Sequence, residues 1–134
     1  MITMQKEIKD MVPIFKKHPE VKLVYLFGSQ ATGDIGPLSD YDFAIYLDEK
    51  NEGKKFNLRL EIMNDLALQL RNDSIDVVVL NDVESPELKY NIIKSGVVVF
   101  EKEPFRVLLE PRILNEYFDF HLLLARYHLT KSKS

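Results

Sequence analysis

Apolar residues recur along this chain with two different spacings, one typical of helices and one typical of strands. Residues 2–17 and 54–71 place apolar side chains every three or four positions, the spacing of an amphipathic helix. Between and after them lie four short runs rich in β-branched and aromatic residues: VKLVYLF (21–27), YDFAIYL (41–47), IDVVVL (75–80) and VVVFE (97–101). Such runs are typical of buried strands.

Local stop and start signals complete the pattern. Ser85 followed by Pro86 predicts the start of a helix, and Gly96 predicts its end. The helix over 54–71 is expected to bury one side, made of Phe56, Leu60, Met63, Leu66, Ala67 and Leu70. The predicted order is helix, strand, loop, strand, and then three helices that alternate with two strands. It indicates an α/β (α+β) fold with one mixed central sheet of about four strands flanked by helices.

The C-terminal segment predicts one more helix, which opens at Pro111 and runs to about Thr130. Its apolar side chains cover more than one face, so a wide surface must be buried. We therefore expect residues 1–104 to form the domain and residues 105–134 to form an apolar helical extension that serves as an interface. A homodimer or a hetero-oligomer would bury it, although the helix could instead wrap its own core.

Composition narrows the possible functions. The 134 residues suit a single domain, and the net charge of −3 gives no basic field for direct nucleic-acid binding. There is no cysteine, which excludes disulfides and thiolate sites and is compatible with a cytoplasmic protein. The apolar runs are too short to span a membrane, and the N-terminus does not resemble a signal peptide.

Two carboxylates stand at the start of the second predicted strand. Asp40 and Asp42 are two residues apart, so both side chains would point to one face of the strand, and Asp76 lies inside the otherwise apolar third strand. Close carboxylates repel unless a cation lies between them, and hard oxygen ligands select Mg²⁺ or Mn²⁺. Three carboxylates could hold two such ions. Alternatively, the first pair belongs to a turn, and Asp76 pairs at a strand edge with Arg71 or a lysine.

A glycine and a serine follow the first strand. Gly28 would let the backbone approach a ligand, and Ser29 could offer its N–H and hydroxyl groups to phosphate oxygens. A simple strand-ending turn would use the same two residues. Ser39, next to Asp40, is a further candidate for nucleotide binding.

Taken together, Gly28, Ser29, Asp40 and Asp42 match the GS-x10-DxD motif of the nucleotidyltransferase superfamily that resembles DNA polymerase β. Asp76 matches its third carboxylate, and SDYDFAIYLD is similar to the MntA antitoxins of HEPN–MNT toxin–antitoxin pairs. The resemblance implies a single minimal nucleotidyltransferase domain with Asp40, Asp42 and Asp76 as catalytic metal ligands. It further implies two Mg²⁺ ions, ATP as substrate, and Gly28 and Ser29 at the phosphates. Its implied function is the transfer of AMP to a tyrosine of a HEPN ribonuclease toxin, which neutralises it.

One departure from the family pattern leaves alternatives open. Relatives often read GSRARG where this chain reads GSQATG, so Gln30 and Thr32 replace arginines that would offset phosphate charge. An antitoxin that acts by binding alone is therefore one alternative. A nucleotidyltransferase for a small molecule, such as an aminoglycoside, is another.

Overall fold

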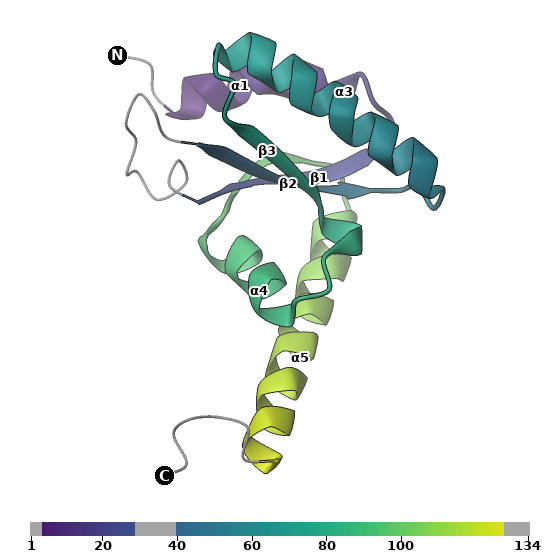
Figure 1. The fold of residues 1–134 in the computed structure, drawn as a ribbon, viewed down its shortest axis with the longest axis vertical. Coiled ribbons are helices and arrows are strands. Elements are labelled where there is room, and N and C mark those ends of the chain that lie inside the picture. Colours follow the sequence, from purple (N-terminus) through teal and green to yellow (C-terminus); the bar gives the residue numbers. More distant parts are fainter. Residues whose placement is uncertain (1–3, 29–39, 128–134) are drawn as a thin grey trace.

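Four strands form one mixed sheet between two pairs of helices in the computed structural model, which describes residues 4–28 and 40–127 (Figure 1). The elements in chain order are α1 (Met4–Lys16), β1 (Val21–Phe27), β2 (Tyr41–Leu47), α3 (Glu52–Leu70), β3 (Ile75–Val79), the 3-10 helix η1 (Leu80–Asp82), α4 (Pro86–Ser95), β4 (Val97–Glu101) and α5 (Phe105–Arg126). The predicted fold class is confirmed. Ser85 caps α4 as predicted, because its side chain accepts a hydrogen bond from the Leu88 N–H.

The sheet order decides which strand ends lie together. The strands follow the order β3-β2-β1-β4, with β1 antiparallel to both of its neighbours and β2 parallel to β3. Because β2 and β3 run in the same direction, the residues at their starts meet at one end of the sheet. β1 ends at that same end, so the loop after β1 begins there.

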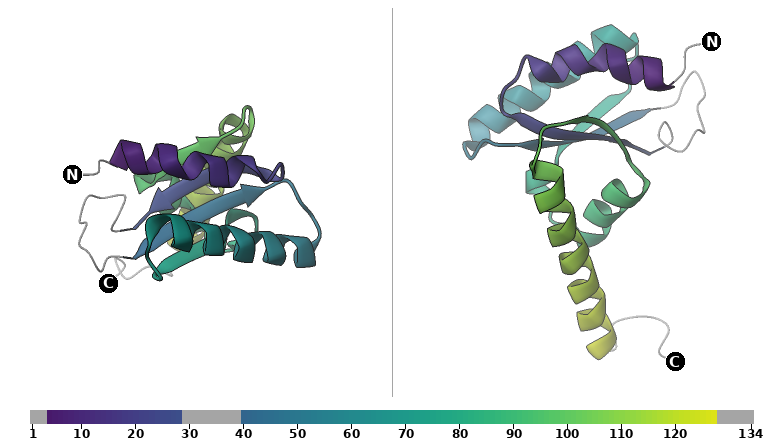
Figure 2. Two further views of the ribbon diagram at one scale, coloured as in Figure 1. Left: turned by 90° about the horizontal axis from the view of Figure 1, so that it is seen from above. Right: turned by 180° about the vertical axis from the view of Figure 1, so that it is seen from behind.

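Helices cover both faces of the sheet. α1 and α3 lie side by side over one face (Figure 2), where Phe15 and Phe43 are fully buried with ring centroids 6.3 Å apart. α4 and α5 lie against the opposite face (Figure 1), where Tyr25, Ile92 and Ile113 are buried. Side chains on both sides of β1 and β2 are therefore largely apolar, apart from the end where these strands meet the 29–39 segment.

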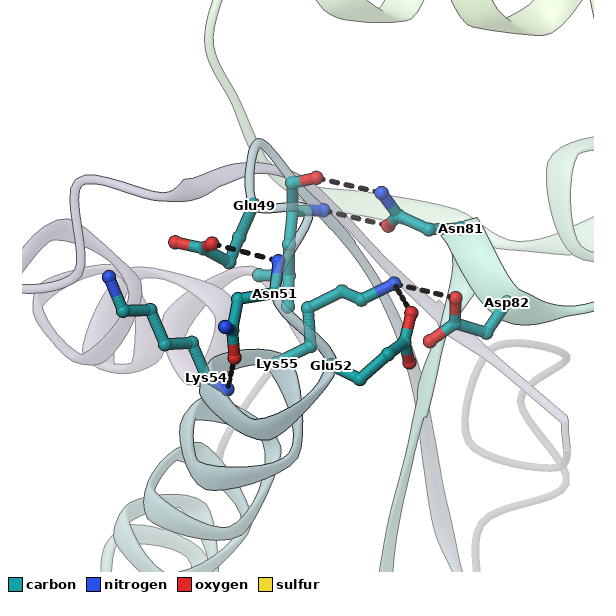
Figure 3. Close-up of polar contacts among 8 residues, drawn as sticks. Glu49, Asn51, Glu52, Lys54, Lys55, Asn81 and Asp82 are labelled. Atoms are coloured by element: carbon teal, nitrogen blue, oxygen red, sulfur yellow. Dashed lines mark hydrogen bonds and ion pairs between the residues drawn. The ribbon is translucent and has the colours of Figure 1, made fainter.

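α3 turns a different side to the sheet than the apolar pattern predicts. Ile62 and Leu66 are fully buried, whereas Phe56 and Leu60 are 55% and 43% exposed, so the prediction was wrong for these two residues. Lys55 takes an inward position instead and is only 6% exposed. Its Nζ lies 2.7 Å from Asp82 Oδ1 and 2.9 Å from Glu52 Oε1 (Figure 3), and two carboxylate partners offset the cost of burying the ammonium group.

A second contact lies next to Lys55, where β2 ends. The Asn81 side chain accepts a hydrogen bond from Leu47 N at 2.9 Å and donates one to Leu47 O at 2.7 Å (Figure 3). Together with the Lys55 ion pairs, these bonds tie η1 to the end of β2 and to the first turn of α3. The start of β2 is at the other end of the sheet.

α5 begins earlier than predicted. It starts at Phe105, directly after Pro104 at the N-cap, and Pro111 lies inside it rather than at its start. A proline in a helix cannot donate the usual hydrogen bond to the carbonyl four residues earlier, here that of Val107. Val107 and Pro111 both lie on the exposed side of the helix, where water can replace that bond, while Leu109 and Ile113 pack on the sheet on either side of the proline.

The apolar character predicted for this helix is not confirmed as a property of the whole helix. Ile113 is the one buried residue of α5, and most of its other apolar side chains are partly or fully exposed. Of the helices that the structure describes, none is long and apolar enough to cross a membrane.

Candidate active site

The three predicted carboxylates line one cavity at the end of the sheet where β2 and β3 start. Asp42 and Asp76 are direct partners in the register of parallel strands β2 and β3, so their side chains leave the same face next to each other. Asp40 immediately precedes β2. The cavity has a volume of about 260 Å³, and its walls are Asp40, Asp42, Asp73, Ser74, Ile75 and Asp76. Asp42 and Asp76 point to the face of the sheet on which α4 and α5 pack. Ala44, two residues after Asp42 and therefore on the same face of β2, is buried in a cluster with residues of α4 and α5.

Gly28 makes room for one of these carboxylates. It follows Phe27, which pairs with Asp42 across β1 and β2, and its φ of +80° is a left-handed conformation that other residues rarely adopt. A Cβ atom at this position would lie 2.4 Å from Asp42 Oδ2. The backbone of the strand end and the Asp42 carboxylate therefore occupy adjoining space, which only a residue without a side chain permits.

The surroundings of Asp42 disfavour its ionised form. Partial burial raises the pKa of its carboxyl group above the ordinary 3.8, and the negative charges of Asp76 and Asp40 raise this pKa further. The ionised form is therefore disfavoured by its surroundings. A cation among these oxygens would reverse that balance, since it would favour the charged form of every carboxylate in the cavity.

Asp76 is not buried, although it lies inside an otherwise apolar strand. Its side chain is 60% exposed, because β3 is an edge strand of the sheet. Its partner is neither Arg71 nor a lysine. Arg59 of α3 reaches around the sheet edge, and its Nη2 lies 3.9 Å from Asp76 Oδ1 while its Nε donates a hydrogen bond to the Val77 carbonyl.

Sequence reasoning missed two residues of this cavity. Asp73 and Ser74 precede β3, and the Ser74 carbonyl accepts a hydrogen bond from Tyr41 N at 2.9 Å, which fastens the two strand starts together. Their position could have been found from the parallel pairing, because residues that precede two adjacent parallel strands lie at the same sheet edge. Ser29 and Ser39, the predicted phosphate contacts other than Gly28, lie outside the described residues.

The donor set of the cavity suits a hard divalent cation. Carboxylate oxygens from Asp40, Asp42 and Asp76 are ligands of the type that Mg²⁺ and Mn²⁺ prefer. Within the residues that the structure describes, no three or more acidic or histidine side chains are already arranged as a metal-binding group. Small side-chain rotations would have to bring the carboxylates onto an ion, and Asp40 and Asp76 are exposed enough to make them.

Comparison with known proteins identifies the family to which this arrangement belongs. Residues 9–105 match the family described as "Polymerase beta, Nucleotidyltransferase". The chain belongs to this family. The predicted resemblance to nucleotidyltransferases is thereby confirmed, and the matched residues include the whole sheet and the cavity, while α5 begins where the match ends.

More specific similarities lie within the nucleotidyltransferases of toxin–antitoxin systems. The protein adenylyltransferase MntA of Aphanizomenon flos-aquae (strain 2012/KM1/D3) is 34% identical over 100 residues, which are 66% of this chain and 63% of that protein. The similarity thus spans less than two thirds of that relative. The predicted resemblance to MntA antitoxins is confirmed.

Solved structures share the fold over nearly the whole chain. A chain of a crystal structure of a toxin–antitoxin with AMP-PNP superposes with a TM-score of 0.74 and 21% identity, over 90% of this chain and 94% of that one. A chain from the tri-AMPylated Shewanella oneidensis HEPN toxin in complex with MNT antitoxin gives a TM-score of 0.70 and 19% identity, over 93% and 95%. The nucleotidyltransferase fold of this chain is therefore the one found in such complexes.

Proposed function

We propose that this nucleotidyltransferase transfers AMP from ATP to a tyrosine hydroxyl of a HEPN-class toxin and thereby neutralises that toxin. The observation that carries the proposal is the pairing of Asp42 with Asp76 in one register, beside a glycine whose missing side chain leaves room for the Asp42 carboxylate. Family membership and the 34% identity to a protein adenylyltransferase support the reaction type. The proposal includes a cytoplasmic location, where ATP and a ribonuclease toxin with cellular RNA substrates would both be available.

The chemical step is an in-line displacement at the α-phosphorus of ATP. The acceptor oxygen forms a new bond to that phosphorus, the bond from phosphorus to the oxygen shared with the β-phosphate breaks, and pyrophosphate leaves with the bonding electrons. The proton of the acceptor hydroxyl passes to a carboxylate oxygen of Asp76, whose side chain is 60% exposed at the cavity edge. Two Mg²⁺ ions bound by Asp40, Asp42 and Asp76 would supply neutralisation of the triphosphate charge and increased acidity of the hydroxyl.

The residues of the site have different roles in this reaction, according to their positions. Asp42 is partly buried and lies against the end of β1, so its carboxylate has a fixed position. A carboxylate in a fixed position can orient the α-phosphorus for attack. Gly28 lets the chain turn away from Asp42 without a side chain in the triphosphate path. Ser29 and Ser39 are proposed to hold phosphate oxygens with their N–H and hydroxyl groups.

A direct labelling experiment tests this function. The purified chain is incubated with α-labelled ATP, Mg²⁺ and a HEPN-class toxin from the same organism, and we expect label on the toxin and loss of its ribonuclease activity. The double variant Asp40→Ala, Asp42→Ala should give neither label nor neutralisation. A toxin that stays unlabelled with the parental chain would refute the proposed transfer, and neutralisation that persists in the double variant would instead identify an antitoxin that acts by binding.

Arg59 offers a separate prediction about the edge of the site. Its hydrogen bond to the Val77 carbonyl and its charge near Asp76 hold β3 where Asp76 faces Asp42. We expect Arg59→Met to lower the rate of AMP transfer by about 10-fold, since the lost charge-assisted bond is worth roughly 1.5–3 kcal/mol and only part of that reaches the site. Lys54→Met, which removes an exposed cation of the same helix, should leave the rate within a factor of two, and equal effects of the two substitutions would contradict this role.

A further inference from the structure

One side of α5 carries an uncovered apolar stripe. The residues that form it are Val107, Pro111, Leu114, Phe118 and Leu122, spaced so that they fall within one sector of the helix. All five are exposed, with exposed fractions from 36% at Leu114 to 72% at Val107 among the four non-proline members. We call these five residues the α5 ridge. It runs along most of the 22-residue helix, which extends well beyond the sheet in Figure 1.

Apart from an edge-to-face contact between Phe118 and Tyr90 of α4, with ring centroids 6.4 Å apart, the α5 ridge is not the side by which the helix packs on its own chain. Contacts with the rest of the chain come from a neighbouring sector, where Ile113 is buried, Leu109 packs beside it and the Tyr117 ring stacks on Tyr90 at 3.8 Å. The remaining sector is mixed, with exposed Arg112, Asn115, Glu116 and Asp119 beside the exposed apolar residues Leu108 and Leu123. The helix is thus held by one apolar side and presents a second apolar side to solvent.

The first half of the α5 ridge borders a groove with an apolar wall and a charged rim. A cavity of about 380 Å³ is lined by Val107, Pro111 and Leu114 and by the charged residues Glu101, Arg106 and Glu110. Arg106 is bonded to both glutamates, at 3.3 Å to Glu101 and 3.0 Å to Glu110. Apolar area surrounded by paired charges is the composition typical of a protein–protein interface.

The comparisons supply a class of partner for chains of this fold, since similar chains occur in crystal structures of toxin–antitoxin complexes. The match to the family of nucleotidyltransferases ends at residue 105, so α5 lies outside the part that the family shares. A chain of an MntA–toxin crystal structure matches 95% of this chain, and the uncovered remainder is shorter than α5. Most of α5 therefore has a counterpart in chains from toxin–antitoxin crystal structures, but α5 lies outside the domain that defines the nucleotidyltransferase family.

We infer that the α5 ridge is the surface on which the HEPN-class toxin docks, through an apolar patch of its own. This inference rests on the proposed function and names the surface by which the acceptor protein is held. The geometry suits that role, because α5 covers the same face of the sheet to which Asp42 and Asp76 point. A protein docked on α5 thus lies on the face of the sheet to which the carboxylates point. To react, it must extend its acceptor hydroxyl from the β4 edge, where Glu101 borders the α5 ridge, to the cavity at the starts of β2 and β3.

The test compares two pairs of exposed residues with the same chemistry. Phe118→Lys with Leu122→Glu alters the α5 ridge, and Phe56→Lys with Leu60→Glu alters an exposed Phe–Leu pair at the same spacing on α3. Both changes leave the net charge unaltered. Because Phe118 also touches the Tyr117 ring, Val107→Lys with Leu122→Glu serves as a second ridge variant, and thermal melts establish that each variant is folded.

Binding is measured without ATP or Mg²⁺, by titration calorimetry against a ribonuclease-inactive form of the HEPN-class toxin used in the labelling experiment. We expect both ridge variants to weaken the Kd by about 100-fold or more, since two buried apolar anchors are lost, and the α3 variant to bind within about threefold of the parental chain. Light scattering of the chain alone is measured in parallel. Parental affinity in the ridge variants would overturn the inference, as would a parental dimer that the ridge substitutions dissociate while toxin binding stays intact.

The outcomes separate this inference from the proposed function. Loss of binding in the ridge variants, with a parental chain that binds but never labels the toxin, would support the docking surface and refute AMP transfer. Labelling by the parental chain, with unchanged binding in the ridge variants, would support the transfer and refute the docking surface. A parental chain that neither binds nor labels the toxin would overturn both.

Discussion

Replacement of Asp42 by Asn is expected to reduce AMP transfer by about 10³-fold or more, while the free energy of unfolding rises. The large effect on rate follows from the position of this side chain, whose carboxylate is enclosed by the end of β1 and faces Asp76 directly. Loss of one preorganised charged group at a reacting phosphorus commonly costs about 10²–10³ in rate, and a metal ligand costs more. Asn keeps the shape of the side chain but removes its charge.

The gain in stability has an electrostatic origin. Burial and the charges of Asp76 and Asp40 raise the pKa of Asp42 in the folded chain above its ordinary 3.8. As the pH rises above 3.8, the unfolded chain releases this proton first, so the folded chain holds more protons and the free energy of unfolding falls. At neutral pH the full cost of ionised Asp42 is present, and the Asn variant does not have this cost.

Two measurements check these expectations. Thermal melts in EDTA from pH 3.5 to 7.5 should show the Asp42→Asn variant gaining on the parental chain as the pH rises, and Mg²⁺ should then stabilise the parental chain more than the variant. Asp48→Asn is the matched control, because Asp48 is an exposed carboxylate directly after the other end of β2. A near-parental rate of transfer in Asp42→Asn would exclude this carboxylate from the chemistry.

Where the candidate residues lie on regular strands, the sequence was sufficient to predict that their carboxylates come together. Asp42 and Asp76 could be expected together because apolar runs define β2 and β3, and parallel pairing brings their starts to one edge. The same reasoning could not decide how deep each carboxylate lies. Asp76 is exposed because β3 is an edge strand, and the strand order depends on packing across the whole sheet rather than on residues 75–80.

The prediction of which side of α3 is buried failed because a lysine side chain lies among the residues that face the sheet. Lys55 is buried because Glu52 and Asp82 pair with it, and Asp82 lies 27 residues further along the chain. The inward side of α3 is therefore rotated from the side that contains Phe56 and Leu60, and helical periodicity alone cannot detect such a rotation. Similarly, Pro111 resembles the first residue of a helix. The helix α5 nevertheless continues on both sides of Pro111, because Leu109 and Ile113 pack on the sheet.

The second large effect is expected at Gly28, where substitution should disable the site without touching a carboxylate. In Gly28→Ala, the new Cβ would lie 2.4 Å from Asp42 Oδ2, so the Asp42 side chain must leave its position beside Asp76. We expect AMP transfer to fall by about 100-fold, since a displacement of about 1 Å at a reacting group has an effect of this size. The left-handed backbone adds a loss of about 1–2 kcal/mol in the free energy of unfolding.

Two further variants separate the contact from the backbone strain. Gly28→Asn introduces the same Cβ, but asparagine tolerates a positive φ, so it should lose activity like Gly28→Ala while remaining more stable. Gly53→Ala is the matched control, because Gly53 lies in the first turn of α3, where an added Cβ meets only Asn51 Oδ1 at 3.3 Å. If Gly28→Ala transferred AMP at the parental rate, the Asp42 carboxylate could move without consequence, and a fixed position for it would not be part of the mechanism.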